Sequence, residues 1–174
     1  MNTVGFFIFQ FDSKEGMTQV LEKGHWMICS TPNFLNEWTP NVSLVKGDMT
    51  NVPVWIKLYD VPLVAYTKDG LSMLASKLGR PVLLDSYTSH MCLQSWGRHS
   101  FARALIELGA TKDFKDSLIV GIPNVNREGF TKQEVSIKYV WCPPHCKHCK
   151  VFGHEDSFCP LQAKPVPVKD TQPN

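Results

Sequence analysis

Four residues near the C-terminal end have the types and the spacing of a metal site. Cys146, Cys149, His154 and Cys159 follow the pattern C-x2-C-x4-H-x4-C. Thiolates and imidazole suit tetrahedral zinc, and the two-residue gap lets two thiolates bind one ion from a single turn. A segment this short cannot fold by apolar burial alone, so bound zinc would supply its folding free energy. The pattern predicts a zinc site with these four ligands, rather than a chance grouping.

Other cysteines and histidines offer weaker alternatives. Cys142, His145 and His148 lie beside the cluster, but using Cys142 would change the first gap to three residues and abandon the complete pattern. Cys29 and Cys92 stand alone among apolar neighbours, which is typical of thiols in a core. Because four cysteines crowd into one short stretch with no secretory signal, metal is favoured over a disulfide framework.

The same cluster argues against catalysis. Four protein ligands close the shell of a zinc ion, whereas a catalytic zinc keeps one position open for water. The sequence contains no H-E-x-x-H helix, no G-x-S-x-G turn and no phosphate-binding glycine loop. A Cys92 nucleophile with His90 or His99 is conceivable but has no supporting motif. We therefore expect no enzyme activity, no catalytic residues and no small-molecule substrate.

Composition places the chain among globular proteins. Of its 174 residues, 43% are hydrophobic and 20% are charged, with a net charge of +2. This balance excludes wholesale disorder, and it is too even for affinity that rests on global positive charge. No apolar stretch approaches the roughly 20 residues of a membrane span, and no signal sequence opens the chain. We expect an intracellular protein, in the nucleus or the cytoplasm, with no membrane association.

The first part of the chain predicts a strand, a helix and a second strand. The aromatic run at 4–11 suggests a buried strand. Asp12 and Glu15 offer a capping box for a helix with Met17, Val20 and Leu21 on its apolar face, which would end at Gly24. A further strand is expected between Trp26 and Trp38, interrupted at Pro32 and Asn33.

The next part of the chain again predicts strands and a helix. Apolar alternation predicts a strand at 53–59, and Thr67 can cap a helix stopped by Gly79 and Pro81. That helix would have Leu71, Leu74, Ala75 and Leu78 on its apolar face. Further strands are expected at 82–85, 101–108, 117–122 and 135–141, although the composition of 101–108 would also suit a helix. The sum predicts an α+β fold with an antiparallel sheet and few helices, both helices packing on one side of the sheet.

Three zones follow from these patterns. Residues 1–141 form the α+β body, 142–160 form the zinc knuckle, and 161–174 read as a flexible, proline-containing tail. Gly153, just before His154, fits a tight turn within the knuckle.

The body and the knuckle together resemble a known family. The motifs that carry the resemblance are W-x-P at 38–40, PVWIKLYDVPL at 53–63, LGRP at 78–81, LD at 84–85, FAR at 101–103, the strand at 135–141 and YVWCPPHCKHCKVFGH at 139–154. In this order they resemble the plant domain of unknown function that precedes a CCHC zinc knuckle in gag-like proteins derived from LINE-type retroelements. The resemblance runs nearly to Pro160.

The resemblance implies a non-catalytic protein that binds nucleic acid, chiefly RNA, with zinc as its only cofactor and self-association as a gag-like role. Members of the family usually begin with another strand and helix, so the chain looks N-terminally truncated. The first elements are similar to part of an RNA-recognition-motif fold. A core strand at 4–11 is nevertheless favoured over a base-stacking strand, because Phe7 stands where a small residue is expected and the partner strand is missing.

The knuckle departs from retroviral knuckles in its charges and aromatic positions. Lys147 stands where those have an aromatic residue, and Glu155 and Asp156 roughly cancel Lys147 and Lys150. We expect weak binding of single-stranded RNA or DNA with little sequence preference. The candidate contacts are Lys138, Lys147, Lys150, Phe152 and Phe158. The alternative is a zinc knuckle that presents Phe152 or Phe158 to a protein partner and binds no nucleic acid.

Overall fold

The computed structural model describes residues 6–24, 26–28, 31–41, 49–94, 100–124 and 128–161. The elements run in the order α1 Lys14–Glu22, β1 Trp26–Ile28, β2 Thr31–Asn33, β3 Asn51–Tyr59, η1 Leu63–Ala65, α2 Lys68–Ser76, β4 Arg80–Leu84, α3 Ser86–Gln94, β5 Phe101–Gly109, β6 Ser117–Pro123, β7 Phe130–Tyr139, β8 His145–Cys146, β9 Val151–Phe152 and η2 Asp156–Phe158.

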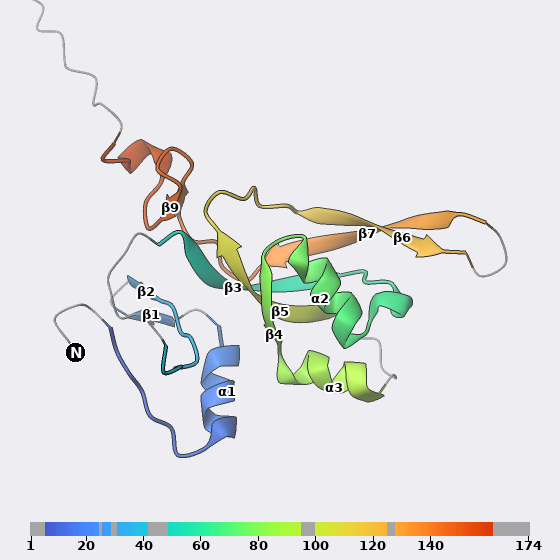
Figure 1. Ribbon diagram of the computed structural model, residues 1–174, viewed down its shortest axis with the longest axis horizontal. Helices are drawn as coiled ribbons and strands as arrows, with labels where there is room; N and C mark the ends of the chain where they lie inside the picture. Colours follow the sequence, from blue (N-terminus) through green and yellow to red (C-terminus); the bar gives the residue numbers. More distant parts are fainter. Residues whose placement is uncertain are drawn as a thin grey trace, which may run out of the picture.

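A five-stranded antiparallel sheet organises the molecule. Its strand order is β4-β5-β3-β7-β6, and β3 lies in the centre, paired with β5 along its whole length. The β6–β7 hairpin extends well beyond the other strands (Figure 1). The predicted α+β class with an antiparallel sheet is confirmed, including the strand at 101–108, which is β5.

The core lies between the sheet and α2. Val54, Ile56 and Leu58 of β3 point to one face, where they meet Leu71 and Leu74 of α2. Thr67 caps α2 as predicted, because its hydroxyl accepts a hydrogen bond from Gly70 N at 3.0 Å. The apolar stripe of this helix thus covers the sheet face to which the even-numbered residues of β3 point.

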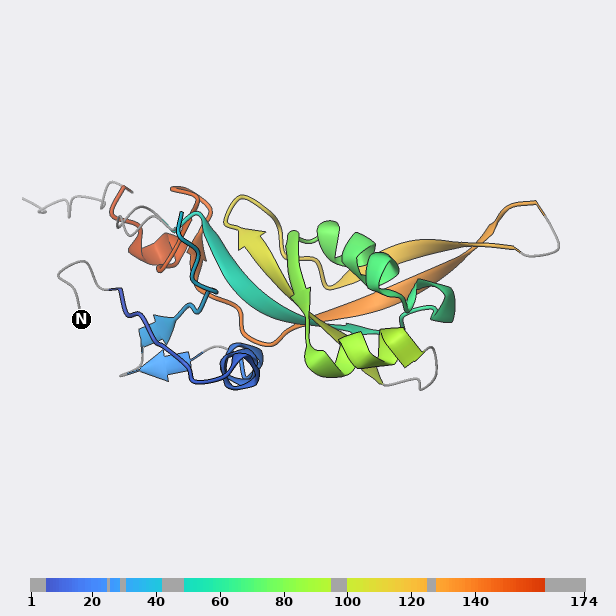
Figure 2. The ribbon, with the colours of Figure 1, turned by 60° about the horizontal axis from the view of Figure 1, so that its bottom comes forward.

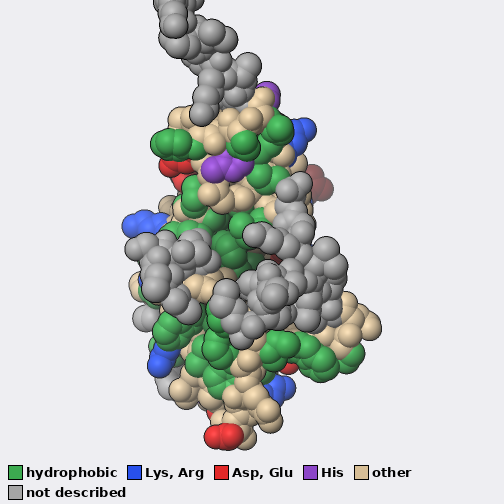
Figure 3. Space-filling model, turned by 90° about the vertical axis from the view of Figure 1, so that its left-hand side faces the viewer, with side chains coloured by type: hydrophobic (Ala, Val, Ile, Leu, Met, Phe, Trp, Pro, Cys, Tyr) green, Lys and Arg blue, Asp and Glu red, His purple; other side chains and the backbone are tan. Residues whose placement is uncertain are grey.

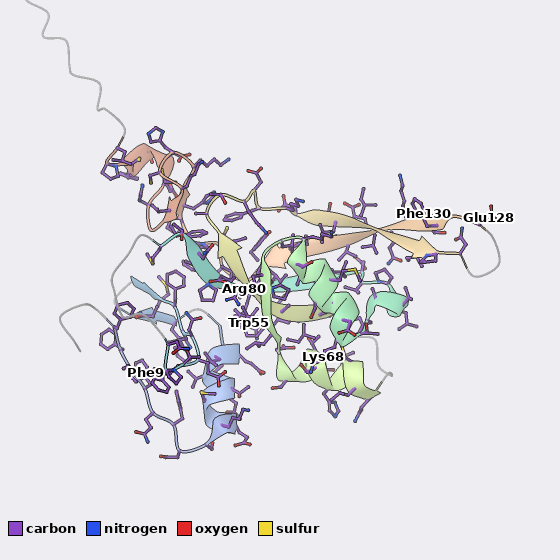
Figure 4. All side chains as sticks on the ribbon, viewed as in Figure 1. Phe9, Trp55, Lys68, Arg80, Glu128 and Phe130 are labelled. Carbon is purple, nitrogen blue, oxygen red and sulfur yellow. The ribbon has the colours of Figure 1, made fainter. Side chains whose placement is uncertain are left out.

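The other face of the sheet holds α1, which corrects the expectation that both helices share one side. Trp55 points away from the α2 core, and its indole donates to Leu21 O at 3.1 Å. Arg103 also donates to Glu22 O at the end of α1. Figure 2 shows α2 on one side of the sheet and α1 on the other, and Figure 4 labels Trp55 near α1. The alternation of strand side chains permits either side for α1, and pairing with Trp55 decides it.

The predicted strand at 4–11 is wrong over residues 6–11, which belong to no strand of the described part of the chain; residues 4 and 5 lie outside that part. Phe7, Ile8 and Phe9 are exposed rather than buried. Strand propensity alone does not make a strand, because a strand needs a neighbour in a sheet to pair with it.

The helix that follows is present, but Ser13 rather than Asp12 is its N-cap and accepts from Gly16 N. Gly24 has the positive φ of +105° expected after a helix end.

The region between Trp26 and Trp38 contains two short paired strands, β1 and β2, with Pro32 opposite Met27. The α3 helix was not predicted. Asp85, assigned to the preceding strand, instead caps this helix by accepting from Thr88 N at 2.9 Å.

Candidate metal centre

The turns that carry the four predicted ligands are set by the backbone. Lys150 N donates to Cys146 O at 2.9 Å, and Lys150 has the left-handed φ of +58°. Gly153 has a φ of +115°, and its amide donates to Pro144 O at 2.9 Å. Positive φ at two positions folds the chain back sharply, which confirms the tight turn expected at Gly153.

The four predicted ligands come together. The ligand atoms of Cys146, Cys149, His154 and Cys159 all lie within 4.8 Å of one another. Cys149 Sγ and His154 Nε2 are 3.3 Å apart. Ligands of a tetrahedral zinc ion with bonds of about 2.3 Å are separated by about 3.8 Å, so this set fits a metal ion such as zinc with small adjustments.

The cluster lies in a sheltered environment. Cys146 is fully buried and Cys159 is 7% exposed. Desolvation, reinforced by hydrogen bonds with the neighbouring thiols, raises the pKa of Cys146 to about 11. At Cys159 desolvation is outweighed by hydrogen bonds, first of all with His154, and the pKa falls to about 6. The four donors therefore include thiols of unequal acidity.

Asp156 has a structural place in the knuckle. Its carboxylate accepts from Lys147 N at 2.7 Å. Hydrogen bonds, first from the Cys146 thiol and then from the Lys147 amide, lower the pKa of Asp156. This carboxylate therefore fixes the backbone of the turn between Cys146 and Cys149, in addition to carrying a charge near Lys147 and Lys150.

The knuckle is anchored to the sheet through Phe152. Phe152 is 3% exposed and belongs to the core that contains β3. Its amide donates to Met49 O at 2.8 Å, just before β3. His145 packs beside Phe152 and against Phe114, with ring centroids 6.0 and 4.5 Å apart. Burial makes Phe152 unavailable to a base or a partner, which argues against its predicted role as a stacking residue.

The remaining predicted contact residues divide between two surfaces. Phe158 is 77% exposed on the knuckle, and Lys147 and Lys150 are exposed beside it. Lys138 lies on β7 of the sheet, opposite Lys57 of β3. Figure 3 shows hydrophobic side chains at the knuckle end and below it on the same side of the molecule.

The other candidate residues stand apart from the cluster. Cys142 is exposed and lies outside the metal-binding group, as does His148. Cys92 is half-buried beside the core, where desolvation raises its pKa, and the His90 ring is 2.9 Å from Gln94 Nε2. Cys29 and His99 lie outside the described residues. The described geometry therefore assembles no Cys92–His90 pair.

Sequence reasoning missed three contributors to this site: Phe152 as an anchor, His145 as its aromatic neighbour and Asp156 as a cap. Asp156 lies three residues before a ligand at a turn, a position where an Asp side chain often accepts hydrogen bonds from backbone amides. The sequence therefore contained a signal for this cap. The burial of Phe152 depends on contacts with β3, roughly a hundred residues away in sequence, and no local pattern reports it.

Comparison with known proteins gives one match. Residues 1–46 match the family model described as Domain of unknown function (DUF4283). The match covers a shorter part of the chain than the resemblance described above. No curated protein and no solved structure matches the chain. Among the residues that the structure describes, no helix is long and apolar enough to cross a membrane.

Proposed function

We propose that the chain is a non-catalytic, gag-like protein of retroelement origin that binds zinc through its C-terminal knuckle and single-stranded RNA or DNA through the knuckle surface. The observation that carries the proposal is the convergence of Cys146, Cys149, His154 and Cys159 within 4.8 Å. Four protein ligands leave no open position on a tetrahedral ion, so the ion would hold structure rather than activate water.

The surface around the cluster supports nucleic-acid binding of modest strength. Phe158 offers an exposed ring on which any base could stack, and such stacking contributes about 1–3 kcal/mol per base. Lys147 and Lys150 stand on the adjacent turn, exposed to solvent. One carboxylate oxygen of Asp156 accepts from Lys147 N, although the residue as a whole is exposed. Because only two lysines would contact phosphates, the binding affinity should fall only slightly as the salt concentration rises.

The origin of the protein is supported by two findings of different kinds. The N-terminal match to a domain of unknown function agrees with the first part of the resemblance, and the Cys/His cluster agrees with its last part. The combination of such a domain with a C-terminal CCHC cluster is the arrangement that the resemblance implies.

The test is fluorescence anisotropy with short RNA and DNA oligonucleotides at two salt concentrations, with and without a zinc chelator. The zinc-loaded protein is expected to bind, and chelation or Phe158→Ala is expected to weaken binding. Absence of binding below millimolar concentrations at low salt would remove the nucleic-acid function.

A protein-interaction knuckle is the second candidate. Phe158 and Leu161 are 77% and 70% exposed and close in sequence, which is also a suitable apolar contact for a folded partner. This function predicts binding that does not vary with salt and no affinity for oligonucleotides.

A further inference from the structure

Three basic residues form a row across the face of the sheet opposite the α2 core. Strand register places Arg103 of β5 directly opposite Lys57 of β3, and Lys57 opposite Lys138 of β7. All three point away from the core, because their neighbours Ala102, Ala104, Ile56, Leu58 and Ile137 are buried in it. Side chains directly opposite on adjacent strands lie about 5 Å apart at Cβ, and like charges there are destabilising. A sheet that lines up three cations is therefore suited to an anionic ligand.

An aromatic ring lies beneath each of these cations. The Lys57 ammonium lies 4.4 Å from the Phe101 ring centroid, the Arg103 guanidinium 4.2 Å from that of Trp55, and the Lys138 ammonium 5.3 Å from that of Tyr59. Tyr59 and Phe101 form the next row of the same face, with centroids 5.5 Å apart. We call Lys57, Lys138, Arg103, Tyr59 and Phe101 the cationic face. Its alternating positive and aromatic groups match the phosphates and bases of a nucleic acid.

The carboxylates near this face are engaged with other groups. Glu107 of β5 pairs with Arg80, which Figure 4 labels on β4. Glu22 accepts from Ser86 N and from the Ser86 hydroxyl, and Asp85 accepts from Thr88 N. Within the described residues, Arg80–Glu107 is the one ion pair, so Lys57 and Lys138 form none there, whereas the charges of Asp85 and Glu22 act on Arg103.

A pocket opens on the cationic face. It has a volume of about 320 Å³ and is lined by Lys57, Phe101 and Arg103 of the sheet, by Val140 just after β7, and by Asp85, Tyr87 and Thr88 at the start of α3. The Arg103 Nε atom is buried and has no hydrogen-bond partner. A buried donor without an acceptor is costly, and an acceptor on a bound ligand would relieve that cost.

We propose that the cationic face is a second binding site for single-stranded nucleic acid, separate from the knuckle. Lys57 and Lys138 contact phosphates, and an unpaired base stacks on Tyr59 or Phe101 at the mouth of the pocket. A base in a duplex is already stacked between its neighbours, so the half-buried rings select an unpaired strand. The inference rests on the proposed function for the class of ligand, but it uses a different surface.

The test compares two double variants that lose the same charge. Lys57→Gln/Lys138→Gln removes the two lysines of the cationic face, whereas Lys68→Gln/Lys77→Gln removes two exposed lysines at the ends of α2, on the opposite side of the sheet. Anisotropy with a fluorescein-labelled oligo-uridine is measured over a range of salt concentrations. Loss of two phosphate contacts on a single strand should reduce the slope of log K against log salt by about 1.4. The α2 variant should keep the slope of the unaltered chain.

The aromatic contribution has its own variant and control. Tyr59→Ala should weaken binding by about five- to 160-fold, the equivalent of one stacked base, while Tyr59→Phe keeps the ring and the affinity. Photo-crosslinking with 4-thiouridine reports the site directly, and adducts are expected on peptides that contain 57–59 and 101–103. Circular dichroism of each variant checks that the fold is kept.

The outcomes separate this site from the knuckle. If Lys57→Gln/Lys138→Gln and Lys68→Gln/Lys77→Gln behave alike and adducts fall only on the knuckle, the cationic face is not a binding site and the proposed function stands alone. If Phe158→Ala and chelation have no effect while the cationic-face variants weaken binding, the inference holds and the knuckle does not bind the oligonucleotide. A chain that binds no oligonucleotide at any salt concentration overturns both.

Discussion

Replacing Phe152 with alanine should destabilise the whole body of the protein, although the residue belongs to the knuckle. Phe152 is 3% exposed and packs into the core with β3. Burial of such a side chain contributes about 1.5–3 kcal/mol, and the cavity left by truncation adds to that loss. The expected cost is about 3–5 kcal/mol, a large part of the total stability of about 5–15 kcal/mol.

The assay is urea unfolding followed by the fluorescence of tryptophans that include Trp55 and Trp141, at saturating zinc. The matched control is Phe158→Ala, which makes the same substitution on the same knuckle at a side chain that is 77% exposed. Surface truncation of this kind changes stability by no more than about 0.5 kcal/mol. Equal and small effects of the two variants would show that the knuckle does not share the core of the sheet.

Three further predictions follow from local geometry. Thr67→Ala removes the cap of α2 and should lower the free energy of unfolding by about 0.5–2 kcal/mol in the same urea assay; no loss would mean that the hydroxyl is not capping in solution. Gly79→Ala places a Cβ 2.5 Å from Glu107 O and should cost about 1–3 kcal/mol through displacement of β5, measured by thermal unfolding, and an unchanged melting temperature would refute that close approach. If the gag-like role includes self-association, Phe7→Ser/Phe9→Ser, at side chains 52% and 59% exposed, should lower the mass measured by light scattering, whereas a monodisperse monomer before substitution would contradict it.

Sequence patterns predicted most of the sheet because apolar residues recur at every second position of the central strands β3 and β5. In β5 Ala102, Ala104 and Ile106 are buried toward the core and Leu105 is buried as well; the composition left strand and helix both open, and pairing with β3 and β4 makes the segment a strand. The α3 helix, SYTSHMCLQ, has no clear apolar stripe, so only its capping residue Asp85 could have indicated it. The aromatic residues at 6–11 have strand propensity, but propensity becomes a strand only where a neighbour pairs with it.

The metal ligands could be predicted from the sequence, but the cationic face could not. Spacing alone brought together Cys146, Cys149, His154 and Cys159, because all four lie in one short segment. The cationic face depends on the register of β5, β3 and β7, which aligns Arg103, Lys57 and Lys138. A shift of one residue in either pairing would turn one of these side chains into the core, and the sequence does not state which register forms.

The central claim is that the Cys/His cluster is a closed zinc site. Elemental analysis of the purified chain should find one zinc ion per molecule, and X-ray absorption should report three sulfur ligands and one nitrogen ligand. Cys149→Ser should lose the zinc or bind it far more weakly, while Cys142→Ser, at an exposed cysteine outside the cluster, should keep it. A chain without stoichiometric metal, or one that keeps its full zinc content after Cys149→Ser, would contradict the account.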